Sequence, residues 1–99
     1  MVWRKTLENS PIRLNDSPAI NPVYVFRWEE SQQAHMLLYP EGLIKLNGPA
    51  GHIMNLIDGK RTVEDIVQAL KDQFDAGDEL GDDVYAFMET ALDKGWIKV

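Results

Sequence analysis

The sequence predicts an α+β domain in which a three-stranded antiparallel sheet is followed by a three-helix bundle. Three short runs rich in β-branched and aromatic residues lie between positions 23 and 46, with hairpin-sized segments between them. Three stretches with apolar residues at helical spacing and recognisable capping residues follow between positions 47 and 94. A chain of 99 residues is long enough for one such domain with a single thin core.

Composition and charge narrow the classes of function. Hydrophobic residues make up 44% of the chain and charged residues 26%, as in ordinary soluble domains. There is no long apolar run, and Met1 to Lys5 lacks the apolar core of a signal peptide, so we expect a cytoplasmic protein without membrane contact. The absence of cysteine excludes disulfides, thiolate nucleophiles and cysteine-ligated metals. The formal charge of 10 basic minus 16 acidic residues is −6, which opposes binding to nucleic-acid phosphates and favours a basic or apolar partner.

The first 22 residues contain three of the five prolines, with Asn, Asp and Ser between them. This composition predicts an irregular N-terminal arm, with at most one short extended piece at Ile12 to Leu14. Residues 23–99 then form the single folded domain.

The strands are expected at Val23 to Trp28, Ala34 to Tyr39 and Leu43 to Leu46. The polar linker Glu29 to Gln33 and the turn Tyr39 to Gly42 connect them into an antiparallel meander, in which proline and glycine favour the tight corner.

Both faces of this sheet are apolar. Alternation places Val23 and Val25 on one face of the first strand and Tyr24, Phe26 and Trp28 on the other. An antiparallel sheet usually keeps one wet face, so we expect the N-terminal arm, a second copy of the protein or a partner to cover the second face.

The third strand, Leu43 to Leu46, has no obvious later strand to pair with, so its outer edge is expected to be free. A free edge beside a helix can accept an extended peptide as an additional strand. Alternatively, the chain's own N-terminal segment covers the edge. The residues alone leave both interpretations open.

Capping residues mark the first two helices. Asn47 precedes Pro49 at a helix start, and Asp58-Gly59 ends that helix. Thr62 and Asp65 form a capping box at the start of the second helix, whose apolar stripe extends to Phe74.

The third helix is expected from about Asp82 to Lys94, after a linker from Asp75 to Gly81. Its acidic start and basic end match the helix dipole. Gly95 is a natural C-terminal cap, and Trp96-Ile97 should pack back or form a short strand.

The sequence offers little for catalysis. His35 and His52 are 17 positions apart and lack a metal-ligand spacing, and the acidic pairs lie in expected loops or helix starts. We expect no enzyme, no metal and no cofactor.

The element order is also compatible with a winged helix-turn-helix domain, so a nucleic-acid-binding regulator is an alternative. The third helix would then enter the major groove. It presents Asp82, Asp83, Glu89 and Asp93 against the single Lys94, a pattern that would repel DNA.

The stretch Ala34 to Asn47, with Trp28-Glu29 before it, resembles protein D of pyrroloquinoline quinone biosynthesis, the PqqD family. The run from Leu37 to Gly42 together with Lys45 to Asn47 is its most specific part. Further matches, within a resemblance that covers roughly residues 23 to 97, are Ala50-Gly51, Ile53, Asp58-Gly59, Arg61-Thr62-Val63, Ile66 and Gly95-Trp96-Ile97.

This resemblance implies a peptide chaperone. Members bind a ribosomal precursor peptide of the PqqA type and present it to a radical S-adenosylmethionine enzyme of the PqqE type. The related precursor-recognition domains bind their peptide as a strand beside the third β-strand, against the third helix. Carried over residue by residue, the resemblance places the peptide-binding site at Leu43, Ile44, Lys45 and Leu46 on the strand and at Val84, Tyr85, Phe87, Met88, Ala91 and Leu92 on the helix.

The chain departs from the family pattern at Pro49, where the family tends to have Ser, and at His52, where it often has Glu. Replacing Ile44 with proline is expected to abolish peptide docking by removing a hydrogen-bond donor of the ladder. Other open interpretations are recognition of a different modified peptide, and a subunit whose edge strand forms a homodimer.

Overall fold

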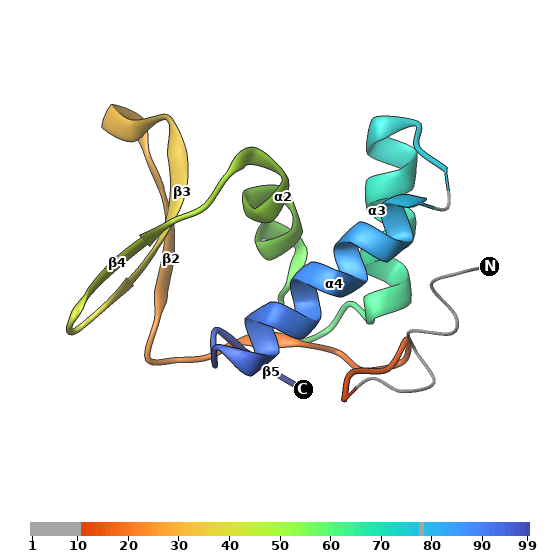
Figure 1. Ribbon diagram of the computed structural model, residues 1–99, viewed down its shortest axis with the longest axis horizontal. Helices are drawn as coiled ribbons and strands as arrows, with labels where there is room; N and C mark the ends of the chain where they lie inside the picture. The colour runs from red at the N-terminus through yellow and green to blue at the C-terminus, as the bar shows by residue number, and fades with distance from the viewer. Residues whose placement is uncertain (1–10, 78) are drawn as a thin grey trace.

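The computed structural model describes residues 11–77 and 79–99 (Figure 1). A three-stranded antiparallel sheet in the order β2-β3-β4 precedes three helices, which confirms the α+β expectation. A two-stranded sheet, β1-β5, joins the two ends of the described chain. The elements are β1 (Ala19–Ile20), β2 (Val25–Glu29), η1 (Glu30–Gln32), β3 (Ala34–Tyr39), β4 (Gly42–Lys45), α2 (Gly48–Leu56), α3 (Val63–Phe74), α4 (Glu79–Asp93) and β5 (Ile97–Lys98).

The strands lie close to their predicted positions. β2 begins two residues later than expected, and the linker to β3 forms the 3-10 helix η1, which ends at Gln33 in the left-handed region with φ 49°. In the β3–β4 hairpin Tyr39 pairs directly with Gly42, so the predicted turn is confirmed.

The predicted helix caps are present. The Asn47 side chain accepts a hydrogen bond from the backbone N–H of Ala50 at 2.8 Å, which stabilises the start of α2. Thr62 and Asp65 form the complete capping box of α3, with the reciprocal side-chain and backbone bonds at 3.1 and 3.0 Å.

α4 is longer at its N-terminus than the sequence suggested. It begins at Glu79, so the predicted linker to Gly81 is too long, and Gly81 is buried inside the helix. Glycine is unfavourable inside a helix, but here its lack of a side chain is compatible with a buried position. At the other end the helix stops at Asp93, and β5 follows as expected.

The described part of the N-terminal arm belongs to the domain. The side chain of Ile12 is fully buried in the core, and Ala19–Ile20 pairs with Ile97–Lys98. The boundary expected at residue 22 is therefore wrong for residues 11–22, while the first ten residues of that arm lie outside the described residues. The extended piece expected at Ile12 to Leu14 is also wrong, because Arg13 and Asp16 close a turn through two hydrogen bonds of about 3 Å.

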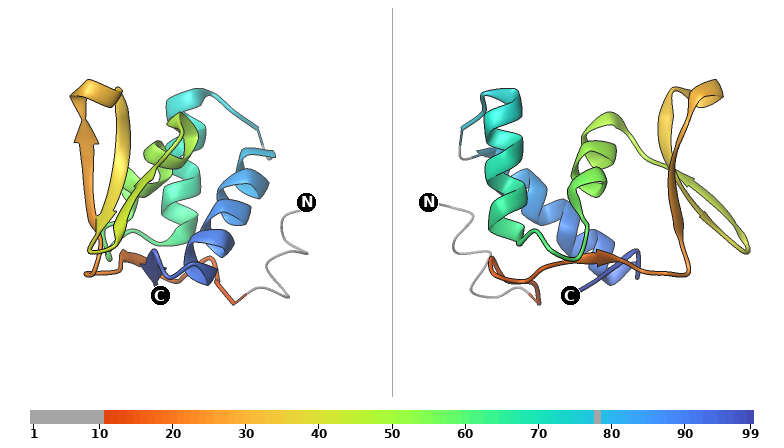
Figure 2. Two further views of the ribbon diagram at one scale, coloured as in Figure 1. Left: turned by 60° about the vertical axis from the view of Figure 1, so that its left-hand side comes forward. Right: turned by 180° about the vertical axis from the view of Figure 1, so that it is seen from behind.

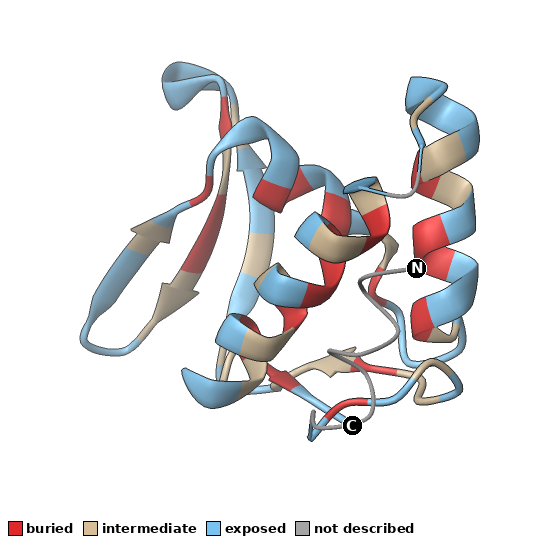
Figure 3. Cartoon of the chain, turned by 45° about the vertical axis from the view of Figure 1, so that its right-hand side comes forward, coloured by how far each residue is buried: buried red, intermediate tan, exposed pale blue. Residues whose placement is uncertain are grey.

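The sheet projects from one end of the helices, and β3 contacts α2 (Figures 1 and 2). The face toward α2, here called the inner face, carries His35 against Gly51, and Leu37 on it is fully buried in the core. The opposite, outer face carries Met36, which is buried but is not part of the core cluster. Figure 3 shows that buried segments, in red, occur both in the helices and in the sheet. Both faces carry apolar residues, as the sequence predicted, and the outer face also carries the charged side chains of Arg27, Glu29 and Lys45. None of the helices within residues 11–77 and 79–99 is long and apolar enough to cross a membrane.

Candidate functional site

β4 is one of the two edge strands of the sheet, the other being β2, and among the described residues only β3 pairs with β4. Residues 11–22 run instead to β5, so that part of the N-terminal segment does not cover the edge. Within residues 11–77 and 79–99, no strand pairs with the outer edge of β4, so the described part of the chain leaves this edge open to an added strand.

The hydrogen bonding of β3 and β4 shows which backbone groups point outward. The N–H of Leu46 donates to the carbonyl oxygen of His35 at 2.9 Å, which makes these two residues a hydrogen-bonded pair. Such pairs alternate along an antiparallel ladder, so Leu37 and Ile44 form the next hydrogen-bonded pair. The backbone N–H and C=O groups of Leu43 and Lys45 consequently point away from β3, toward the free edge.

The four strand residues expected in the site thus divide into two pairs. Leu43 and Lys45 offer their backbone to a ligand, and their side chains lie exposed on the outer face. Ile44 and Leu46 direct their backbone N–H and C=O groups toward β3. Their side chains lie on the inner face, where Ile44 is half-buried and Leu46 is buried. The expectation that a proline at Ile44 removes a donor from the peptide ladder is wrong, because that N–H faces β3.

Most of the helix surface expected in the site is inaccessible. Within α4 the side chains of Val84, Tyr85, Met88 and Ala91 are fully buried in the core, so they do not form an open docking surface. The two remaining predicted residues, Phe87 and Leu92, are only half-buried. All six residues were expected in the site because the buried stripe of α4 and the half-buried residues beside it are all apolar.

β4 and α4 share one side of the molecule. In Figure 1 both lie toward the reader, in front of β2 and α3, and the order is reversed in the view from behind (Figure 2, right). A strand added to β4 would therefore lie on the same side of the molecule as α4.

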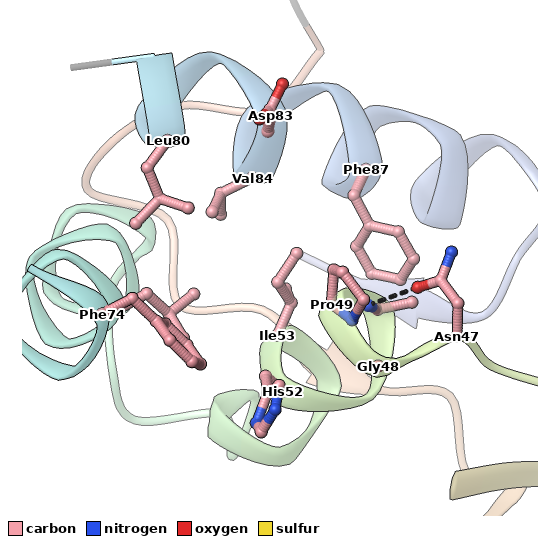
Figure 4. Close-up of a pocket in the computed structure, with 12 residues that line it drawn as sticks. Asn47, Gly48, Pro49, His52, Ile53, Phe74, Leu80, Asp83, Val84 and Phe87 are labelled. Atoms are coloured by element: carbon pink, nitrogen blue, oxygen red, sulfur yellow. Dashed lines mark hydrogen bonds between the residues drawn. The ribbon is translucent and has the colours of Figure 1, made fainter. Parts of the chain in front are cut away.

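An apolar pocket of about 500 Å³ opens between the start of α2, the end of α3 and the first half of α4 (Figure 4). Asn47 and Phe87 connect it to the rest of the site, because Asn47 directly follows Leu46 and Phe87 is one of the accessible α4 residues. The pocket is lined by Asn47, Gly48, Pro49, Ala50, His52, Ile53, Leu70, Phe74, Leu80, Asp83, Val84 and Phe87.

Sequence reasoning missed this pocket. Phe74 ends the apolar stripe that the sequence predicts for the second helix, yet it is 49% exposed. Its ring meets the imidazole of His52 edge-on, with centroids 5.1 Å apart. The sequence feature that could have indicated the pocket is the position of Phe74 in the last turn of its helix, where an apolar side chain often lacks a partner in the core.

The polar groups of the pocket do not resemble a catalytic arrangement. Asn47 already accepts the Ala50 N–H as a helix cap, and His52 and Asp83 are exposed side chains at the rim. Across residues 11–77 and 79–99, no cluster of His, Asp and Glu side chains could hold a metal ion. An apolar cavity of this size with a few polar groups at its rim is suited to binding bulky apolar groups.

Known proteins of one kind match the chain. A family model described as coenzyme PQQ synthesis protein D (PqqD) matches residues 34–97. A "PqqA binding protein" of Azotobacter vinelandii is 41% identical over 90 residues, which are 91% of this chain and 98% of that protein. A "PqqA binding protein" of Pseudomonas entomophila is 50% identical over 80 residues, which are 81% of this chain and 88% of that protein.

A solved structure matches the fold as well. It is the solution structure of the PqqD truncation of Methylobacterium extorquens PqqCD, described as a functional, stand-alone recognition element for ribosomally synthesised and post-translationally modified peptides. The TM-score is 0.75 at 26% identity, over 93% of this chain and 99% of that one.

Proposed function

The chain belongs to the PqqD family, and on that premise we propose that it binds the precursor peptide of pyrroloquinoline quinone by strand addition to β4. It then presents the bound peptide to the radical S-adenosylmethionine enzyme of the pathway. The chain acts as a carrier and performs no chemistry on the peptide. Relatives named for binding PqqA support the peptide as the ligand.

The free edge of β4 is the observation that carries this proposal. Leu43 and Lys45 together offer two N–H donors and two carbonyl acceptors in the spacing of an antiparallel or parallel ladder. Strand addition satisfies these groups with the backbone of the peptide, and side-chain pockets then select the sequence.

The apolar pocket supplies that selection. A peptide strand that pairs with Leu43 and Lys45 reaches Asn47 within two residues, and Asn47 and Phe87 line the pocket. A bulky apolar side chain of the peptide enters between Phe87 and Phe74. Burial of one such side chain contributes about 1.5 to 3 kcal/mol, comparable to two or three backbone hydrogen bonds.

The affinity should be moderate. About four edge hydrogen bonds of roughly 1 kcal/mol each and one apolar anchor are offset by about 2 to 5 kcal/mol for ordering the free peptide. Reversible binding suits a carrier that must release its peptide.

A titration of isotope-labelled protein with the synthetic precursor peptide tests the proposal. Saturable changes in backbone amide shifts are expected at Leu43 and Lys45, with further changes at Phe87 and Phe74. The matched control is a scrambled peptide of identical composition, which should give small, unsaturated shifts. Saturable shifts that leave both β4 and the pocket unaffected would contradict the assigned site, and an absence of saturable shifts would contradict peptide binding itself.

A further inference from the structure

The outer face of the sheet carries an exposed apolar row. Val25, Leu38 and Leu43 lie directly opposite one another on β2, β3 and β4, and the row reaches the free edge at Leu43. Val25 and Leu43 are each 57% exposed. The helices do not cover this row, because α2 packs on the inner face, where His35 meets Gly51.

The neighbouring row on the same face is cationic at both ends. Met36 lies between Arg27 and Lys45 in register and is only 5% exposed, although it is outside the core cluster. Its burial therefore comes from its neighbours on the outer face. Arg27 pairs with Glu29 at 2.8 Å, which leaves the Lys45 ammonium as the free cation among the outer-face residues of the three strands.

Strand addition would extend this surface with peptide side chains. Side chains of a strand alternate between the two faces, so peptide residues level with Ile44 point inward, toward α4 and the pocket. Peptide residues level with Leu43 and Lys45 point outward and continue the two rows across the sheet. The inward residues are thus enclosed by the carrier, whereas the outward residues lie in one surface with Val25, Leu38 and Leu43.

We propose, on the basis of the peptide carriage described above, that the peptide-modifying enzyme docks on this outer face and contacts carrier and peptide side chains together. The surface fits an apolar patch with carboxylates at its rim, which would meet the row and the Lys45 ammonium. Such docking lets the enzyme distinguish loaded from empty carrier, because the empty carrier lacks the fourth strand of the surface.

Net charge argues against a second copy of the chain as the occupant. Two copies each carry a formal charge of −6 and repel one another at low ionic strength.

Val25→Glu tests the proposal, because Val25 lies on β2 at the strand farthest from the peptide edge. The peptide affinity of this variant should stay within about twofold of the unaltered protein, since no edge group changes. Its affinity for the immobilised radical S-adenosylmethionine enzyme, measured with saturating peptide, should fall by about tenfold or more, because an unpaired carboxylate must be desolvated in an apolar contact. The matched control is Val99→Glu, which places the same charge at a residue that is 58% exposed and lies beyond β5.

Three results would overturn the proposal. The first is an unchanged enzyme affinity of Val25→Glu. The second is an equal loss in Val99→Glu, which would show a general charge effect. The third is sedimentation of the unaltered chain as a dimer that Val25→Glu converts to a monomer, which would assign the face to self-association.

A failure of peptide carriage is distinguishable from these results. If the unaltered protein does not bind the precursor peptide, the proposed function fails directly, and the composite surface fails with it. If peptide binds normally and only the enzyme assay is unaffected by Val25→Glu, the function stands and the docking surface is wrong.

Discussion

The sharpest consequence of the β4 geometry is that proline should have opposite effects at two adjacent positions. The N–H of Lys45 points to the free edge, whereas the N–H of Ile44 pairs with Leu37 of β3. Proline is tolerated on an edge strand when its missing N–H would face solvent. Lys45→Pro should therefore fold normally and bind peptide poorly.

The size of the effect follows from one lost donor. A net hydrogen bond contributes about 0.5 to 1.5 kcal/mol, and a carbonyl of the peptide left unpaired beside the proline ring raises the cost to about 1 to 3 kcal/mol. The peptide dissociation constant should rise by about 5- to 150-fold. The free energy of unfolding should change by less than about 1 kcal/mol, because no hydrogen bond of the free protein is lost.

Calorimetric titration with the precursor peptide and urea unfolding measure these two quantities. Lys45→Ala is the matched control, since it removes the ammonium and keeps the N–H, and its affinity should stay within about threefold. Ile44→Pro should instead lower the free energy of unfolding by about 1 to 3 kcal/mol, because it breaks the β3–β4 ladder. If Lys45→Pro binds as well as the unaltered protein, or Lys45→Ala loses as much as Lys45→Pro, strand addition through this N–H is refuted.

Two further substitutions test how the site is held in place. Gly51→Ala should lower the free energy of unfolding by about 1 to 2 kcal/mol in urea denaturation, because the added Cβ would lie 2.5 Å from Nδ1 of His35, whose ring stacks on Phe26. The higher helix propensity of alanine offsets only part of this clash. Unchanged stability would refute the close packing of α2 on the sheet. The backbone N–H groups of Arg61 and Lys60 donate to the Asp58 carboxylate and hold the pKa of Asp58 below its ordinary value of 3.8. The ionised Asp58 therefore stabilises the fold above pH 3.8, and this stabilisation is lost as the pH falls through the lower pKa of the folded state. The urea midpoint of the unaltered protein should therefore fall more steeply than that of Asp58→Asn below about pH 4, and parallel curves would contradict this assignment.

Local signals in the sequence predicted local structure well. The capping residues Asn47, Thr62 and Asp65 act on backbone groups within three positions, so the sequence alone contains the whole interaction. The turn between Tyr39 and Gly42 is equally local. Each of these features is confirmed by the structure.

Signals that depend on distant partners were not predictable in the same way. Ile12 lies between Pro11 and Arg13 in a proline-rich segment, and only the folded structure shows that it belongs to the core. Along α4 the periodicity identified an apolar stripe, but only the packing of the whole core shows that Val84 and Met88 are enclosed while Phe87 stays half-buried. The pocket is a property of three helix ends together, so no single segment of the sequence predicted it.

The division of the site into edge and pocket has a consequence for specificity. The edge groups of Leu43 and Lys45 are backbone atoms, so under the proposed strand addition they would bind any extended chain with similar hydrogen bonds. Discrimination between peptides must therefore come from side chains, chiefly where Phe74 and Phe87 shape the pocket. A related carrier that recognises a different peptide should keep the register of β4 and differ in the residues of the pocket. Exchange of the pocket residues between two such carriers should therefore transfer the peptide preference. Exchange of the β4 side chains should leave the preference unchanged.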